Sequence, residues 1–179
     1  MGSVAGSNGK NGKQKTARDM ILSMGLISLA AGVIYLFLPH DDSAPDLKRV
    51  DYRVELLTAR RAASYPVAAP QGLSADWKAT SVRFSGENFD AWHLGFHDSE
   101  GEYVAVEQSA QKPSVFIDEK TQSAQETKVT QRIGDATWTR YEGDKYDALV
   151  LREKGSTTVV TGTAPFDRLT KMAQALKTT

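Results

Sequence analysis

Cysteine is absent from this chain of 179 residues, and histidine occurs only three times. Without cysteine the protein can form no disulfide, thiolate zinc site or iron–sulfur cluster, and it has no cysteine nucleophile. An excess of positive charge is also missing, because 22 lysines and arginines balance 22 aspartates and glutamates. A general nucleic-acid binder is normally basic, so we expect no nucleic-acid partner.

The sequence also lacks the short motifs that mark common active sites. It contains no Gly-x-Ser-x-Gly nucleophile elbow, no His-Glu-x-x-His zinc motif and no Gly-x-Gly-x-x-Gly dinucleotide fingerprint. Its N-terminal glycines do not have the spacing of a phosphate-binding loop. We therefore expect no catalytic residue, no cofactor and no metal ion.

One long apolar run without charge is present, at residues 20–38, and reads MILSMGLISLAAGVIYLFL. A helix of that length spans about 28 Å, close to the roughly 30 Å hydrocarbon core of a bilayer. A helix in a soluble core would show a polar stripe, which this run lacks. The run predicts a single helix that spans the membrane once.

The charges that flank this helix predict its orientation. Basic residues precede it and acidic residues follow it: Lys10, Lys13, Lys15 and Arg18 before, and Asp41, Asp42 and Asp46 after. Because basic flanks stay in the cytoplasm, we expect a cytoplasmic N-terminus and an extracytoplasmic C-terminal part at the cell membrane. A cleaved signal peptide is the alternative, but the run exceeds the usual apolar region and no clear cleavage site follows it. We favour an uncleaved signal anchor.

Gly25, Ser28 and Gly32 fall on one face of the expected membrane helix. Small residues at such spacing allow helices to pack closely, so these three are candidates for contact with a membrane-protein partner. The alternative is that small residues are common in membrane helices in any case.

The remaining sequence predicts an α+β fold, with an antiparallel β-sheet domain and a packed C-terminal helix after the transmembrane helix. The expected organisation is a disordered basic cytoplasmic tail at 1–19, the transmembrane signal-anchor helix at 20–38, a linker at 39–47 and an extracytoplasmic domain at 48–179. Apolar alternation and β-branched runs predict strands at 50–56, 78–84, 92–97, 103–107, 127–133, 136–141, 146–153 and 156–161. Helices are expected at 113–122 and 166–176, each introduced by a proline.

The turn at Gly101 sets the register of the hairpin formed by residues 92–107. A three-residue loop that ends in a left-handed Gly101 pairs Phe96 with Val104, which places all the large apolar side chains on one face. A loop one residue shorter or longer mixes apolar with polar residues on each face. The favoured register also places His93 opposite Glu107.

His93 and Glu107 are candidate binding residues on the polar face of this hairpin, with His97 nearby. A His–His–Glu metal site is one alternative, but zinc requires three or four ligands. A solvent-facing row of polar cross-strand pairs is therefore the favoured interpretation. Trp77 is a third candidate binding residue beside a proline-rich loop, although core packing is favoured for each of the three tryptophans.

Four segments together resemble a known family: KTARDMILS, LKRVDYRVEL, YPVAAPQGLSADWKATSVRF and GSTTVVTGTAPFDRLTKMAQAL. They are similar to the actinobacterial membrane-anchored proteins called domain of unknown function 4245, and the resemblance covers residues 15–176. The resemblance implies a single-pass envelope protein with an external α+β domain. It implies no activity, because the family has no assigned catalytic or binding residues.

These observations predict a membrane-tethered extracytoplasmic binding or interaction module of the cell envelope, without catalysis of its own. The alternatives are an envelope hydrolase and an accessory subunit of a larger membrane protein complex. Convergent acid, base or nucleophile groups in the folded domain would favour the hydrolase. An apolar groove without them would favour the binding module.

Overall fold

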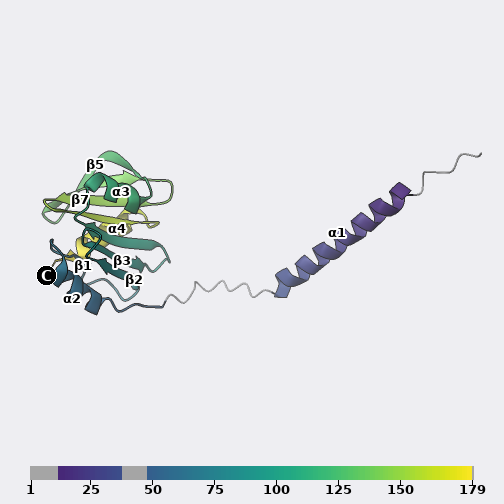
Figure 1. Cartoon of the computed structure of the whole chain (residues 1–179), viewed down its shortest axis with the longest axis horizontal. Coiled ribbons are helices and arrows are strands. Elements are labelled where there is room, and N and C mark those ends of the chain that lie inside the picture. Colours follow the sequence, from purple (N-terminus) through teal and green to yellow (C-terminus); the bar gives the residue numbers. More distant parts are fainter. Residues whose placement is uncertain (1–11, 38–47, 179) are drawn as a thin grey trace, which may run out of the picture. The chain divides into compact units, whose positions relative to one another are not determined.

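The computed structural model describes the backbone of residues 12–37 and 48–178 (Figure 1). The chain divides into two compact units, Met1–Ala44 and Pro45–Thr179, and each is described by itself.

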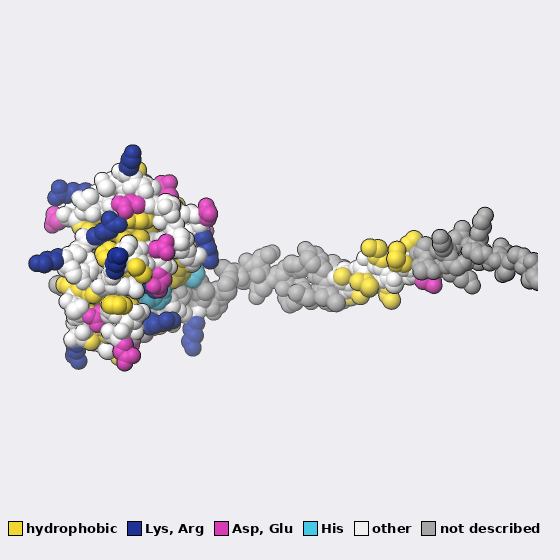
Figure 2. Space-filling model, turned by 45° about the horizontal axis from the view of Figure 1, so that its top comes forward, with side chains coloured by type: hydrophobic (Ala, Val, Ile, Leu, Met, Phe, Trp, Pro, Cys, Tyr) yellow, Lys and Arg dark blue, Asp and Glu magenta, His cyan; other side chains and the backbone are white. Residues whose placement is uncertain are grey.

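The described part of the first unit is one helix, α1, at Gly12–Phe37. It begins at Gly12 rather than at Met20, so residues 12–19 of the expected disordered tail are helical. The side chains of residues 19–33 are all exposed, and hydrophobic groups are visible along this helix in Figure 2. In the described part of the chain, no helix is both long and apolar enough to cross a membrane.

Part of the expected membrane span lies outside the described residues. Leu38 and the side chains of residues 34–37 are not described. The expected linker at 39–47 also lies outside the described residues.

The second unit has an α+β fold built on antiparallel sheets, as the sequence predicted. Its main sheet has seven strands in the order β2-β3-β4-β8-β7-β6-β5. Their bounds are Lys78–Ser85 for β2, Ala91–His97 for β3, Tyr103–Ser109 for β4, Gln125–Ile133 for β5, Ala136–Glu142 for β6, Asp147–Glu153 for β7 and Ser156–Gly162 for β8. The helices of this unit are α2 at Arg53–Ala62, α3 at Pro113–Thr121 and α4 at Phe166–Ala175.

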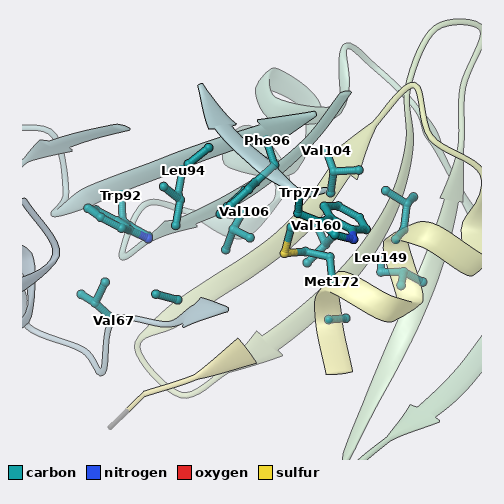
Figure 3. Close-up of a cluster of buried hydrophobic side chains, with 14 of the residues drawn as sticks. Val67, Trp77, Trp92, Leu94, Phe96, Val104, Val106, Leu149, Val160 and Met172 are labelled. Atoms are coloured by element: carbon teal, nitrogen blue, oxygen red, sulfur yellow. The ribbon is translucent and has the colours of Figure 1, made fainter. Parts of the chain in front are cut away.

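Helices α3 and α4 cover opposite faces of the main sheet. Leu169 and Met172 of α4 are buried in the larger apolar cluster, and Phe116 and Ile117 of α3 are buried in the smaller one. Figure 3 shows labelled side chains of the larger cluster, from several strands and from α4, pointing into one interior. Because β7 lies between the two layers, it is apolar on both faces, and Leu149 within it is fully buried.

The hairpin of β3 and β4 has the register predicted from its turn. The partners include Phe96 with Val104, Leu94 with Val106 and His93 with Glu107. Gly101 has a φ of +83°, in the left-handed region that an L side chain rarely adopts. The prediction of a bulged three-residue turn is confirmed.

The strand predicted at 50–56 is wrong, because this segment enters helix α2 at Arg53. The apparent alternation belongs to a helical repeat in which Tyr52, Leu56 and Ala59 face the larger cluster. Val54, which a half-buried strand would have placed inward, is 76% exposed.

A second, two-stranded sheet joins the segment after α2 to the C-terminal end of this unit. Strand β1 at Ala69–Pro70 pairs antiparallel with β9 at Leu176–Lys177. The C-terminal helix consequently ends at Ala175, one residue before the predicted end.

Both outer strands of the main sheet contain an irregularity in pairing. In β2 the register shifts between Ala79 and Ser81, and in β5 it shifts between Glu126 and Thr130. The shift in β2 decides where the side chain of Ser81 lies, because it sets Ser81 beside Gly95 of β3.

Candidate functional site

The three candidate binding residues of the folded unit do not form one site. His93 and Glu107 lie together on the sheet face covered by α3, where Lys120 of α3 approaches Glu107. Trp77 is buried in the cluster on the opposite face, 4% exposed. The sheet therefore separates a polar site from an apolar one.

A row of three polar side chains crosses neighbouring strands β2, β3 and β4. The Ser81 Oγ atom is 2.8 Å from His93 Nε2, and His93 Nδ1 is 2.6 Å from Glu107 Oε1. Both distances are those of hydrogen bonds. We refer to Ser81, His93 and Glu107 as the polar row.

Glu107 is the most deeply buried member of the polar row. Ser81 is half-buried, the His93 side chain is 26% exposed and the Glu107 side chain is 9% exposed. The expectation of a fully solvent-facing row is therefore wrong at Glu107. Histidine side chains of this unit still reach its surface, as the cyan groups in Figure 2 show.

The hydrogen bonds define the tautomer of His93. An ionised Glu107 carboxylate can only accept, so the proton must be on Nδ1 of His93. In the neutral imidazole Nε2 then carries the lone pair, and it can accept the hydroxyl proton of Ser81. The Lys120 ammonium, whose Nζ atom is 4.0 Å from Oε2 of Glu107, adds a positive charge beside the carboxylate.

Tyr103 borders the polar row at Ser81. Burial is the main factor that raises the pKa of the Tyr103 phenol to about 12, and the negative charge of Glu107 adds to it. The phenol is therefore neutral at physiological pH and keeps a proton that it can donate. Its hydroxyl group and the Ser81 hydroxyl both lie beside Gly95.

Gly95 makes the meeting of these groups possible. A β-carbon at Gly95 would lie 2.3 Å from Ser81 Oγ and 3.0 Å from the Tyr103 hydroxyl oxygen. Contacts that short are excluded by van der Waals repulsion. A glycine opposite Ser81 is thus a requirement of the arrangement.

His97 does not join His93 and Glu107 in a metal site. Its Nδ1 atom is 3.3 Å from Thr80 Oγ1, and its ring packs at 5.5 Å between centroids on Tyr103. Among the residues that the structure describes, no three His, Asp or Glu side chains gather closely enough to hold a metal ion.

Trp77 forms part of a cavity of about 490 Å³ on the other side of the sheet. Apolar and aromatic residues of its wall include Tyr52, Leu73 and Phe96. Arg49 and Arg53 also line it, with Asp51 as the acidic residue. The cavity wall thus combines apolar side chains with two cations and one carboxylate.

Arg49 is fixed in the wall of this cavity. Its guanidinium donates to the carbonyl oxygens of Ala75 at 2.6 Å and of Trp77 at 3.4 Å. Arg53 is different, because its side chain is 87% exposed and its nearest carboxylate, on Asp51, is 4.0 Å away. Arg53 is therefore the cation that is available to a ligand.

Gly25 and Gly32 of α1 have open space around them. Nothing lies within 4 Å of the position that a β-carbon would take at either residue. With Ser28 they lie among the exposed side chains of that helix, and their proposed role in packing stays a prediction.

Sequence reasoning identified His93 and Glu107 but not Ser81. A serine on an edge strand gives no signal by itself, and Ser81 reaches His93 because of the register shift in β2. The half-buried Tyr103 and Gly95 lie within the predicted hairpin of residues 92–107, but no sequence motif marks either of them.

Comparison with known proteins gives one match. A family model described as "Protein of unknown function (DUF4245)" matches residues 13–176. No curated protein and no solved structure matches the chain.

Proposed function

The chain belongs to the DUF4245 family of unknown function, and we propose that it is a membrane-tethered extracytoplasmic binding module of the cell envelope. The observation that carries this proposal is the cavity lined by Trp77 and Phe96. Its volume is within the range of roughly 300–1,000 Å³ that is usual for small-molecule sites.

The chemistry of the cavity wall selects an amphiphile as the ligand. Aromatic and aliphatic groups favour an acyl chain or a ring, because burying apolar surface contributes about 25 cal/mol per Å². The exposed Arg53 guanidinium favours an anionic group at the mouth of the cavity. A single-chain lipid with a carboxylate or phosphate head has both parts.

The tether is supported by the composition and exposure of α1. Residues 20–37 carry no charge, and large apolar side chains such as Ile21, Leu26 and Ile27 are each more than 60% exposed. An apolar helix without a polar face has no stable place in water. A bilayer satisfies such a surface, and the basic residues before it favour a cytoplasmic N-terminus.

Fluorescence of cis-parinaric acid, an anionic polyene fatty acid, tests the binding function. We expect its emission to rise on addition of the full chain in detergent, with energy transfer from tryptophan. Ala75→Trp places a large side chain at the exposed position 75 in the cavity wall and should lower the affinity at least about tenfold. Arg53→Ala should lower it less, since an exposed cation contributes only a modest amount.

The matched control is Arg61→Ala, which removes a basic residue of α2 outside the cavity wall. Equal binding by the wild type, Ala75→Trp and Arg61→Ala would contradict the assignment of the cavity. So would the absence of any rise in emission with the wild-type chain.

External protease on intact protoplasts tests the tether independently. We expect digestion of the domain that follows Asp41 and protection of the residues that precede the helix. The protein should also stay with the membrane at high salt, because a spanning helix does not depend on charge. Protection of the domain from protease would contradict the orientation.

A further inference from the structure

The polar row has the connectivity of a nucleophile–base–acid triad. A serine hydroxyl is hydrogen-bonded to the free nitrogen of a histidine, and a carboxylate holds the other nitrogen. That order of contacts, rather than any fold or motif, is what defines such a triad. It also meets the criterion set out for a hydrolase, which is the convergence of nucleophile, base and acid within hydrogen-bond reach.

We propose that Ser81, His93 and Glu107 form a catalytic triad that hydrolyses carboxylic esters. Ser81 is the nucleophile, His93 the general base and Glu107 the residue that positions His93. The site lies across the sheet from the cavity of Trp77, so this proposal does not rest on the proposed binding function.

The observed environment suits each of these roles. Ser81 and His93 are both half-buried, so a substrate can reach them, and Glu107 is the most enclosed of the three. A purely structural cross-strand pair would need only two partners, whereas here Gly95 leaves room for the third group. The neutral hydroxyl of Tyr103 next to Ser81 is a donor available to a developing oxyanion.

The reaction balances with water as the only co-substrate. Ser81 Oγ forms a bond to the carbonyl carbon while its proton passes to Nε2 of His93. Collapse of the tetrahedral adduct breaks the ester C–O bond, and the departing alkoxide takes that proton. Water then attacks the acyl-serine, its proton passes through His93 back to Ser81, and the carboxylic acid leaves.

Esters are the substrate class that this site favours over amides. Ser81 and His93 are only half-buried on their sheet face, where Lys120 of α3 approaches Glu107. An alcohol leaves more readily than an amine, so an ester demands less protonation and less exclusion of water.

A fluorophosphonate probe tests the nucleophile directly in the full-length chain in detergent. Such a probe phosphonylates an activated serine with loss of fluoride, and peptide mass spectrometry locates the adduct. We expect the adduct on Ser81, and its loss in Ser81→Ala. Ser85→Ala is the matched control, because it removes a half-buried serine from the same strand and should label as the wild type does.

Two further variants test the base and the residue that positions it. His93→Gln should lower the labelling rate by at least about 100-fold, the usual contribution of a general base. Glu107→Gln should lower the rate while Glu107→Asp partly restores it, because only a carboxylate keeps the Nδ1–H tautomer. For the hydrolysis of p-nitrophenyl acetate, Glu107→Gln should lower kcat and leave KM nearly unchanged.

Thermal unfolding of each variant separates lost chemistry from lost fold. A folded wild-type chain that leaves Ser81 unlabelled would overturn the proposal. Labelling at an unchanged rate in folded His93→Gln would overturn it equally, since Ser81 would then react without its base. Either result leaves binding in the cavity of Trp77 unaffected.

Discussion

Arg168 of α4 reaches across to Asp98, whose side chain is fully enclosed at the turn between β3 and β4. The Arg168 Nη1 atom is 3.4 Å from Asp98 Oδ2. Oδ1 of Asp98 accepts hydrogen bonds from the backbone N–H groups of Glu100 at 2.9 Å and Glu102 at 3.0 Å. One carboxylate thus holds the hairpin turn and connects it to the helix that covers the core.

Asp98→Ala should destabilise the folded unit by about 2–4 kcal/mol, because it leaves two backbone donors without their acceptor and removes the enclosed carboxylate from the partners of Arg168. Urea unfolding followed by tryptophan fluorescence measures the change. Glu100→Ala is the control: Glu100 also contacts Arg168, but its side chain is 63% exposed, so its loss should cost at most about 1 kcal/mol. Equal effects of the two substitutions would argue against the role of Asp98.

Gly101→Val should destabilise the unit by about 1–2 kcal/mol through the backbone alone. No atom lies within 4 Å of the position of a β-carbon there, so the cost comes from forcing a β-branched residue to a φ of +83°. Gly101→Asn should cost less, since asparagine tolerates this region. The prediction fails if valine and asparagine give the same unfolding midpoint.

Met172→Ala should destabilise the unit by about 2–5 kcal/mol, because it opens a cavity at a fully buried position beneath α4. Lys171→Ala, at the exposed position just before it, should stay within about 0.5 kcal/mol of the wild type.

Deletion of residues 166–179 should abolish cooperative unfolding. A truncated chain that melts at the original temperature would show that α4 is not part of the core.

Stability should fall in strongly alkaline solution, in part through Tyr103. Its pKa is raised from 10 to about 12, so above pH 10 the phenol ionises in the unfolded chain before it ionises in the folded one. The stabilisation is therefore complete below pH 10 and is lost as the pH rises from 10 to about 12. Unfolding midpoints of the wild type should decline more steeply across this interval than those of Tyr103→Phe, and parallel curves would contradict the prediction.

The elements that sequence predicted well are those whose local pattern and tertiary role agree. The turn at Gly101 fixes a register that the apolar alternation of β3 and β4 also requires, so both signals lead to one answer. The prediction of a strand at 50–56 was wrong because an alternating pattern over so few residues is also compatible with one face of a helix. Only the packing of Leu56 and Ala59 on the core decides between them.

The candidate sites were predictable only in part, for a related reason. The predicted hairpin register placed His93 opposite Glu107, because the length of the turn determines which residues face each other across the two strands. Ser81 joins them through a register shift in β2, and nothing in residues 78–85 signals that shift. The cavity of Trp77 depends on α2 and on the loop before β2 meeting at one place, which is a property of the tertiary fold.

The two register shifts in the outer strands bear on how copies of this domain behave when they are crowded together. A flat outer strand offers a continuous line of free backbone donors and acceptors to another molecule. Here the shifts between Ala79 and Ser81 and between Glu126 and Thr130 interrupt that line at both margins of the sheet. Both outer strands are therefore poor templates for edge-to-edge pairing with another copy of the domain.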